Sequence, residues 1–353
     1  MRIKLPNRFS RIVRIVAVIL LLVIGAYILN SQRSEFDGAI VMVKDAKGSA
    51  IILAIIAEML SVLTFGLFTY ILLQVDLPKV GWLRPVGISL ASTTLNNSLP
   101  GGAAISSVYT YREYRDLGAG PAFATWTVLA INIISGVALA AMAILGVAVS
   151  FRVSQGLDLI VVIFSLTLAL VILSVAISNA KIVGGLASSL MRMSFKLLSK
   201  PSGGRVEIDR IAAELTAATP GVRSMLLALL FALLNWVFDA LVLVLAYEAI
   251  GKPIPWSGLL LAYGAGQLAA NLPITPGGLG VVEGSLSIAL VAYGGAQESA
   301  VAAVLIYRLV SYWLTMPFGW AVYVVTVILR RKRNGKASQA GVAVVEGFAN
   351  EKA

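Results

Sequence analysis

Long apolar stretches separated by short polar segments dominate the sequence. Runs of about 18 or more residues with few or no charges predict membrane-spanning helices, because about 20 helical residues cross the hydrocarbon core of a bilayer. Six such runs lie at residues 15–32, 49–74, 117–151, 157–177, 224–247 and 299–329. The last run contains Arg308 and Pro317, so it predicts either one kinked helix or two shorter pieces. The pattern therefore predicts an all-α polytopic membrane protein with about six crossings.

The first apolar run follows a basic segment, residues 1–14, and a cleaved signal peptide is the alternative interpretation. A signal peptide ends at a cleavage site made of small residues. The residues at that place are Tyr27, Ile28, Leu29 and Asn30. We therefore favour a retained first span.

Two stretches, residues 85–111 and 255–296, interrupt the apolar pattern because they are rich in Ser, Thr, Asn, Gly and Pro. A simple lipid-facing helix would not contain them, since the exposed backbone would be unsatisfied in hydrocarbon. We expect two re-entrant helical hairpins packed inside the protein. Their breaks are predicted at Pro100, Gly101, Gly102, Pro273, Pro276, Gly277, Gly278 and Gly280.

The Pro-Gly-Gly triplets that begin at Pro100 and Pro276 lie 176 residues apart, half the chain length. Two ordinary loops are the alternative, but the offset and the polar residues before each triplet favour an internal repeat. Its halves would be residues 49–151 and 224–329. In a six-crossing topology the spans before the two hairpins run in opposite directions. Inverted repeats with broken helices near the midplane are typical of transporters.

The charges set the expected orientation. The chain has 353 residues, with 28 Lys and Arg against 17 Asp and Glu, a formal net charge of +11. Basic residues concentrate in residues 1–14, 178–223 and 330–336, which should be cytoplasmic. Residues 31–48 carry three basic and three acidic residues and should be external. This topology accounts for the positive charge, so nucleic-acid binding is not needed.

Composition narrows the chemistry. Hydrophobic residues make up 59% of the chain and charged residues only 13%, too few to cover a water-soluble surface. The chain contains no His and no Cys. This excludes a His- or Cys-ligated zinc site, a Ser-His-Asp triad, a thiol nucleophile and disulfides. We expect no metal site and no cofactor. The groups that remain available for binding or reaction are carboxylates, Arg, Tyr and backbone groups.

Arg308 is the strongest candidate for a binding residue. An Arg within a span costs about 2.5–3.5 kcal/mol on insertion scales, so it should face a partner or a cavity. Its planar guanidinium could hold a lipid phosphate through two hydrogen bonds. The alternative is a structural salt bridge with Glu283, Asp239 or Glu58, and both roles can coexist.

The remaining candidates are residues embedded in spans or at the breaks. Glu283 could neutralise Arg308, bind a cationic head group or carry a proton, and the other two acids could couple transport to protons. Residues at the breaks are expected to cap half-helices or contact head groups, with capping favoured. An aromatic belt fits at least as well as a head-group cage for Tyr109, Tyr111, Tyr307, Tyr312, Trp313 and Trp320. The candidate substrate-binding set is Arg308, Glu283, Glu58, Asp239, Asn97, Asn271, Thr275 and Tyr307. Arg112 and Glu113, near a membrane boundary, are a candidate gate or an interfacial pair.

The segment NLPITPGGLGVVEGSL at residues 271–286, followed by YRLVSYW at residues 307–313, resembles the flippase-like membrane domain of lysylphosphatidylglycerol synthases. This domain is the membrane portion of the bacterial multiple peptide resistance factor and of stand-alone relatives. Residues 96–102 and 109–113 match the first half of the pattern, and the resemblance covers most of residues 10–330. The run P-x-T-P-G-G-x-G-x-x-E with the later Tyr-Arg is its most specific part.

The resemblance implies movement of a lipid, often an aminoacylated or glycosylated one, between leaflets. The full synthases add a cytoplasmic domain that esterifies lysine onto phosphatidylglycerol. The chain ends at residue 353 after a short tail, so synthase activity is not carried over and no enzyme activity is expected. We expect one flippase-like domain over residues 15–335 and a disordered cytoplasmic tail over residues 336–353. Its place would be the cytoplasmic membrane of a prokaryote, with both termini in the cytoplasm.

Three other functions stay open at this point. The chain could be a membrane enzyme acting on lipid-linked substrates, although it lacks His and any D-D-x-x-D motif. It could be an accessory protein for a separate synthase or glycosyltransferase, or a transporter of small solutes. Expected partners are membrane lipids, such a separate enzyme and a second copy in a homodimer, and not nucleic acid.

Overall fold

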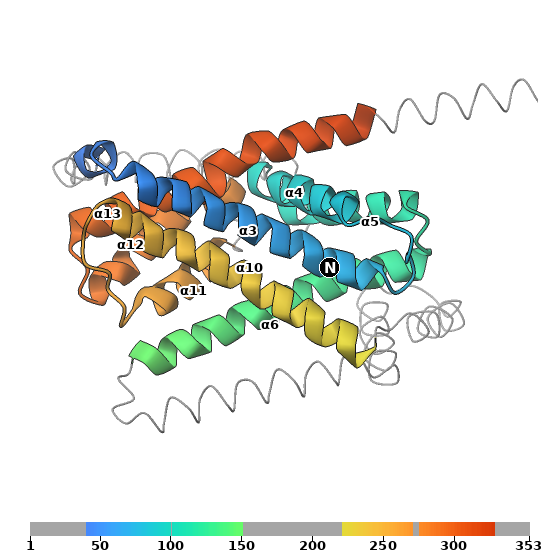
Figure 1. The fold of residues 1–353 in the computed structure, drawn as a ribbon, viewed down its shortest axis with the longest axis horizontal. Coiled ribbons are helices and arrows are strands. Elements are labelled where there is room, and N and C mark those ends of the chain that lie inside the picture. Colours follow the sequence, from blue (N-terminus) through green and yellow to red (C-terminus); the bar gives the residue numbers. More distant parts are fainter. Residues whose placement is uncertain (1–39, 100, 151–220, 271–274, 329–353) are drawn as a thin grey trace, which may run out of the picture.

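The computed structural model describes residues 40–99, 101–150, 221–270 and 275–328, and the regular structure within these ranges is helical (Figure 1). Four helices in these ranges are long and apolar enough to cross a membrane: Gly48–Leu73, Pro121–Val147, Val222–Ala249 and Gln297–Ile328. They coincide with four of the six predicted spans. The other two, residues 15–32 and 157–177, lie outside the described residues, as does most of the predicted 178–223 loop.

The helices follow one another in two groups. The first group is α3 (Gly48–Leu73), α4 (Leu83–Ser98), α5 (Gly102–Asp116) and α6 (Pro121–Ser150). The second group is α10 (Val222–Ala249), α11 (Leu259–Ala270), η1 (Pro276–Gly278), α12 (Val281–Ala292), α13 (Gln297–Arg308) and the π-helix η2 (Leu309–Leu314).

Helices α3 and α10 pack side by side along their length and form the centre of the bundle (Figure 1). The backbone N–H of Lys47, just before α3, donates to the carbonyl oxygen of Ala249 at the end of α10 over 2.8 Å. The two helices are therefore antiparallel. Small buried residues, among them Ala54, Ala57 and Ala246, allow their backbones to approach closely.

Two helical hairpins, α4–α5 and α11–α12, pack on the long helices, with α4 against α3 and α11 against α6. Their limbs contain 16, 15, 12 and 12 residues, or about 18–24 Å at 1.5 Å per residue. Each limb is thus shorter than the hydrocarbon core of about 30 Å. The chain reverses through left-handed glycines, with φ of 69° at Gly101 and 59° at Gly277, a conformation that glycine adopts at little cost.

The last predicted span is a single helix over residues 297–328. Its α-helical hydrogen bonding changes to a π-helical turn directly after Arg308 and returns to α-helix for residues 315–328. π-Helical turns are rare and often occur at functional sites. The turn lies beside the cavity described below.

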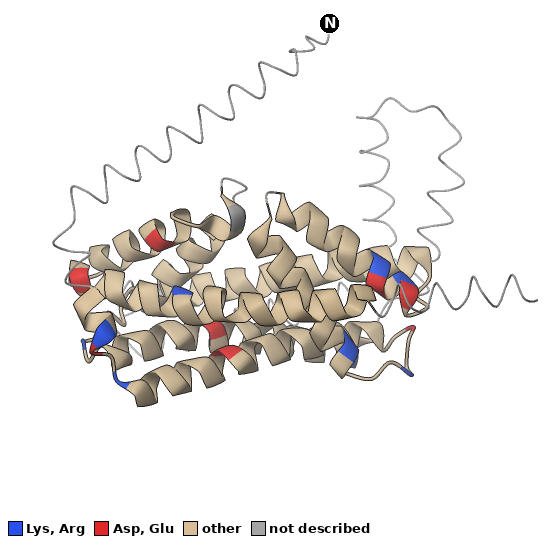
Figure 2. Ribbon diagram, turned by 90° about the horizontal axis from the view of Figure 1, so that it is seen from above, with Lys and Arg blue, Asp and Glu red and all other residues tan. Residues whose placement is uncertain are grey.

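Most charged residues lie toward the two ends of the bundle, whereas its middle is largely uncharged (Figure 2). Large apolar side chains such as Ile52, Met59, Leu129 and Ile288 are exposed on the outer faces. This distribution suits a protein surrounded by hydrocarbon. The few charged side chains within the helices therefore require a specific environment.

Candidate functional site

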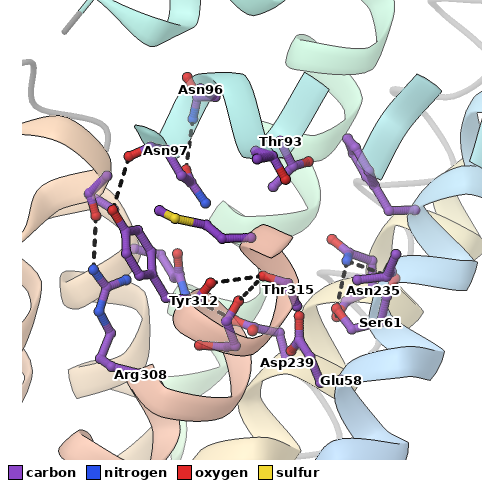
Figure 3. Close-up of a pocket in the computed structure, with 18 of the residues that line it drawn as sticks. Glu58, Ser61, Thr93, Asn96, Asn97, Asn235, Asp239, Arg308, Tyr312 and Thr315 are labelled. Atoms are coloured by element: carbon purple, nitrogen blue, oxygen red, sulfur yellow. Dashed lines mark hydrogen bonds between the residues drawn. The ribbon is translucent and has the colours of Figure 1, made fainter. Parts of the chain in front are cut away.

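A cavity of about 250 Å³ lies where α3, α4, α10, η1 and the last helix converge. The amide side chains of α4 lie on one side of it, and the acids of α3 and α10 lie on the other (Figure 3). Its polar lining includes Glu58, Ser61, Asn96, Asn97, Asn235, Asp239, Arg308 and Tyr312.

The cavity lies at the middle of the two central helices. Ser61 and Asn235 each stand 13 residues after the first residue of helices that are 26 and 28 residues long. The Asn235 amide donates to the Ser61 hydroxyl over 2.8 Å and to its carbonyl oxygen over 3.1 Å. The Ser61 hydroxyl donates back to the carbonyl oxygen of Asn235 over 3.1 Å. These bonds fix the crossing point of α3 and α10.

Asp239 is the acceptor in a buried hydrogen-bond network that joins three helices. Its Oδ2 accepts from the Tyr307 hydroxyl over 2.8 Å and from Gln267 Nε2 over 3.0 Å, and also from the Tyr263 hydroxyl. Gln267 Nε2 also donates to the Tyr307 hydroxyl oxygen over 2.7 Å. This oxygen is therefore fully hydrogen-bonded inside the protein.

Glu58 of α3 and Asp239 of α10 lie beside each other on the wall of the cavity (Figure 3). The side chain of Glu58 is buried, with 6% of the residue exposed. Its Oε2 is buried without a hydrogen-bond partner among the described residues. An unsatisfied buried oxygen is uncommon and calls for an explanation.

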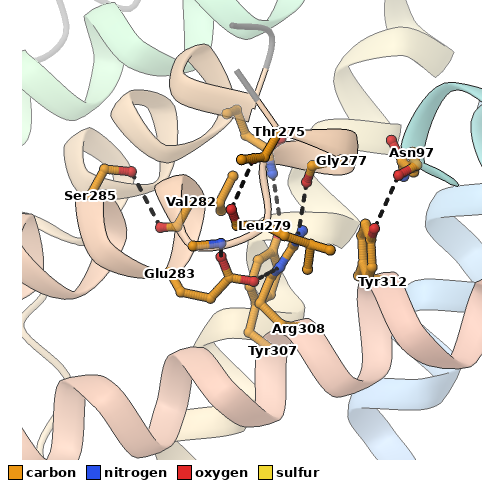
Figure 4. A network of polar contacts seen from close by, with 12 residues as sticks. Asn97, Thr275, Gly277, Leu279, Val282, Glu283, Ser285, Tyr307, Arg308 and Tyr312 are labelled. Carbon is orange, nitrogen blue, oxygen red and sulfur yellow. Dashed lines mark hydrogen bonds and ion pairs between the residues drawn. The ribbon is translucent and has the colours of Figure 1, made fainter. Parts of the chain in front are cut away.

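Arg308 forms an ion pair with Glu283, with 2.7 Å between Nε and Oε1 (Figure 4). Its Nη2 donates to the carbonyl oxygen of Gly277 over 3.0 Å, and its guanidinium lies 4.0 Å from the centre of the Tyr312 ring. Among the candidate partners of Arg308, the structure thus pairs it with Glu283. The other oxygen of Glu283 accepts from the N–H of Gly280 over 2.7 Å, so this acid also anchors the start of α12.

The turns of the two hairpins meet beside the cavity. The end of α4 contacts η1, and the Tyr312 hydroxyl donates to the carbonyl oxygen of Asn97 over 3.0 Å. A Cβ added to Gly277 would lie only 2.7 Å from that same oxygen. Glycine at this position is therefore what allows the contact.

Five of the predicted binding residues line this cavity: Glu58, Asp239, Asn97, Tyr307 and Arg308. Glu283 does not line the cavity but is ion-paired with Arg308, which does. Asn271, Pro100 and Pro273 lie outside the described residues. The predicted roles as substrate ligands stay predictions.

The capping role favoured for the polar residues at the breaks is wrong for Asn97 and Thr275. The residue before α5 is Gly101, and α5 has no side-chain cap. A capping hydroxyl accepts a hydrogen bond from a helix N–H. The Thr275 hydroxyl instead donates one, to the carbonyl oxygen of Leu279 over 2.8 Å. Backbone conformations available to glycine make the turns instead.

The aromatic-belt interpretation is wrong for two tyrosines. Tyr307 and Tyr312 are 3% and 2% exposed, and both hydroxyls are hydrogen-bonded inside the protein. Belt residues lie at the membrane surface, whereas these two bind the charged groups of the interior.

The candidate gate residues, Arg112 and Glu113, lie away from this cavity. They stand about ten residues after the start of α5, or about 15 Å along its axis from the hairpin turn. Together with Tyr109 and Tyr323 they line a separate, mostly apolar groove. Their role as a gate stays a prediction.

Several residues of the site were not in the candidate substrate-binding set, among them Ser61, Tyr263 and Tyr312. Each of these three has a helical spacing to another polar residue of the site. Ser61 follows Glu58 by three positions, Tyr312 follows Arg308 by four, and Tyr263 precedes Gln267 by four. Residues three or four apart share one face of a helix, so a search for such polar pairs in apolar helices would have found them.

Among the residues that the structure describes, no three acidic side chains gather in a way that could hold a metal ion. The chemistry available at the cavity is therefore one guanidinium, several carboxyls, phenol hydroxyls and amides. Such groups bind and orient polar or charged ligands.

Comparison with known proteins identifies the family. Residues 13–319 match the family described as the lysylphosphatidylglycerol synthase TM region, and the chain belongs to this family. It is also similar to a UPF0104 membrane protein of Methanothermobacter thermautotrophicus, with 22% identity over 323 residues, 87% of this chain and 93% of the relative. The family resemblance carried by the Pro-Gly-Gly segments is thereby confirmed, and the chain is a membrane protein.

Proposed function

We propose that this protein moves a lipid between the leaflets of the cytoplasmic membrane by passing its head group through the cavity. The lipid would be a phospholipid or an aminoacylated or glycosylated lipid. The observation that carries the proposal is the cavity itself, which holds Glu58, Asp239 and Arg308 at mid-depth of two apolar spans. Membership of a family defined on the membrane region of a lipid-modifying synthase supports a lipid-related role.

The size of the cavity suits a head group and not a whole lipid. Its volume of about 250 Å³ equals the space of roughly eight water molecules, at about 30 Å³ each. A phosphate with a small polar substituent fits this space, but acyl chains do not. In this proposal the chains stay in hydrocarbon while the head group crosses.

Arg308 is the proposed ligand of the lipid phosphate. Two of its five N–H donors are used by Glu283 and Gly277, and the face of Tyr312 fixes the plane of the guanidinium. A phosphate that accepts from the remaining donors would share or displace Glu283. Such a bidentate contact is the geometry in which Arg differs most from Lys.

An inverted repeat is the proposed basis of alternating access. The helices α10, α11, α12 and α13 begin 174, 176, 179 and 176 residues after α3, α4, α5 and α6. The first members of the two sets, α3 and α10, are antiparallel, as an inverted repeat requires.

The packing between the two sets is also reciprocal. Gly146 of α6 lies against Leu261 of α11, where an added Cβ would come within 2.7 Å of the backbone nitrogen. In the same way, Gly319 of the last helix lies against α4, with 2.9 Å between an added Cβ and the carbonyl oxygen of Leu90. Together with the short limbs of both hairpins, this reciprocal packing supports an inverted repeat with two re-entrant hairpins.

The test is lipid movement in vesicles that contain the purified full-length protein and a labelled anionic phospholipid. We expect the wild type to expose the label to a membrane-impermeant quencher, and Arg308→Ala to abolish this movement. Arg308→Lys should retain only part of it, because the charge remains but the fork is lost. Arg223→Ala, at an exposed position near the start of α10, is the matched control and should move lipid like the wild type.

If a folded Arg308→Ala protein moves the lipid as fast as the wild type, Arg308 is not the ligand of the lipid phosphate. No movement of any tested lipid by the wild type would remove the proposed function.

A further inference from the structure

Glu58 and Asp239 line the same cavity, and Glu58 is buried. Two buried carboxyl groups beside each other repel when both are ionised, and a proton bound by one of them removes this repulsion. The hydrogen bonds between Ser61 and Asn235 hold together the two helices that carry Glu58 and Asp239.

The hydrogen-bond donors around the two acids indicate which of them carries the proton, and they favour Glu58. Asp239 Oδ2 accepts from three donors on α11 and α13, which favours the charged form. The Oε2 of Glu58, in contrast, is buried without a hydrogen-bond partner among the described residues. Glu58 also lines the cavity, so the same side chain joins the buried pair to the space proposed for the head group.

The charges around the cavity link this proton to the lipid. The titratable groups near Glu58 are Asp239 from α10, Tyr263 from α11 and Tyr307 from α13, and Arg308 of α13 lines the same cavity. Arg308 is already paired with Glu283. Within the described part of the chain, carboxyls thus outnumber the single cation at this site, and a lipid phosphate adds another negative charge. A neutral Glu58 lowers that repulsion in a region where charges are weakly screened.

A route for the proton exists on the α4 side of the cavity. A second cavity of about 200 Å³ shares Phe65, Thr93 and Asn96 with the first. Its wall is uncharged and rich in hydroxyl groups, including those of Thr69, Ser89, Ser92 and Thr110. A polar space of this size has room for several water molecules, which could carry a proton between Glu58 and the region between α4 and α5.

We propose that Glu58 binds and releases a proton in each cycle, so that an anionic lipid head group moves together with a proton. This inference rests on the proposed function. One proton and one monoanionic lipid are together electrically neutral. Movement should therefore respond to a pH gradient and not to a membrane potential.

Two measurements test this on the purified full-length protein in lipid. The first is infrared spectroscopy of the carbonyl stretch of a protonated carboxylic acid. We expect such a band in the wild type, its loss in Glu58→Gln, and its retention in Glu248→Gln. Glu248 is an exposed acid on α10 and serves as the matched control. A band that Glu58→Gln leaves unchanged overturns the assignment of the proton to Glu58.

The second measurement follows labelled phosphatidylglycerol and an internal pH dye in the same vesicles. With the acidic side facing the labelled leaflet, we expect faster lipid movement and acidification of the interior. An imposed potassium-diffusion potential should change neither. Glu58→Gln should lose both the gradient dependence and the acidification.

The outcomes separate the two proposals. Wild-type lipid movement that is equal with and without the gradient, with no acidification, overturns proton coupling and leaves lipid movement intact. This result needs no variant, so it does not depend on whether Glu58→Gln folds. Absence of any lipid movement by the wild type overturns the proposed function and the coupling together.

Discussion

Replacing Gly277 by alanine tests whether the contact between the hairpin turns is tight. Gly277 has a φ of 59°, and an added Cβ would lie 2.7 Å from the carbonyl oxygen of Asn97 and 2.7 Å from the hydroxyl oxygen of Tyr312. Neither neighbour can move freely, because the Tyr312 hydroxyl is itself hydrogen-bonded to that oxygen. The substitution should therefore force the turns apart.

The expected loss has two parts that the chain allows us to separate. A left-handed conformation costs a non-glycine residue about 1–2 kcal/mol, and overpacking a well-packed site costs about 1–3 kcal/mol more. Gly280 in the same turn has a φ of 80°, and an added Cβ there meets nothing within 4 Å. We expect Gly277→Ala to lower the free energy of unfolding by about 2–5 kcal/mol and Gly280→Ala by about 1–2 kcal/mol.

The free energy of unfolding can be measured by reversible denaturation of the purified protein in bicelles, followed by tryptophan fluorescence. The difference between the two variants, about 1–3 kcal/mol, isolates the steric part. Equal losses would show that the turns are not in tight contact and would refute the reasoning. Lipid movement by Gly277→Ala should fall as well, because the cavity wall formed by this turn is displaced.

Three further substitutions test the packing around the cavity by the same measurement. Asn235→Ala removes the two hydrogen bonds that the Asn235 side chain donates to Ser61 of α3 and should cost about 0.6–1.7 kcal/mol. Asn132→Ala breaks only a bond within its own helix and should cost less. Gly319→Ala should destabilise by about 1–3 kcal/mol because α4 occupies the space for a Cβ; Gly136→Ala, with open space around it, should be neutral or stabilise by up to about 1 kcal/mol. Tyr312→Phe removes one hydrogen bond to α4 and should cost about 0.5–1.5 kcal/mol while lipid movement persists, since the ring still holds the guanidinium. An unchanged or inverted order within either pair, or loss of movement in the phenylalanine variant, would contradict these expectations.

The long helices and their breaks could be predicted from the sequence because both depend on local properties. The number of consecutive apolar residues decides whether a helix can span a bilayer, and Pro-Gly-Gly decides where it cannot continue. The special position of Arg308 also follows from the sequence, since a charge inside an apolar run has to find a partner.

The partners themselves could not be predicted, because they depend on how distant helices pack. The sequence left Glu283, Asp239 and Glu58 as equal alternatives for Arg308. Only the fold brings the start of α12 beside the end of α13 and so selects Glu283. The burial of Tyr307 is a similar case, since a tyrosine near the end of an apolar run looks the same at a membrane surface and in a protein interior. The π-helical turn after Arg308 likewise has no local signal.

The energetics of the cavity argue that its charges serve function and not folding. A buried ion pair is often neutral or destabilising compared with well-packed apolar residues, by about 1–4 kcal/mol. Helices α3 and α10 already pack through small residues such as Ala54 and Ala57, and this packing does not require Glu58 or Asp239. A protein selected only for stability would fill the space with apolar side chains. Two acids and an arginine line the cavity instead, namely Glu58, Asp239 and Arg308, and their presence supports the proposal that the cavity binds a charged ligand.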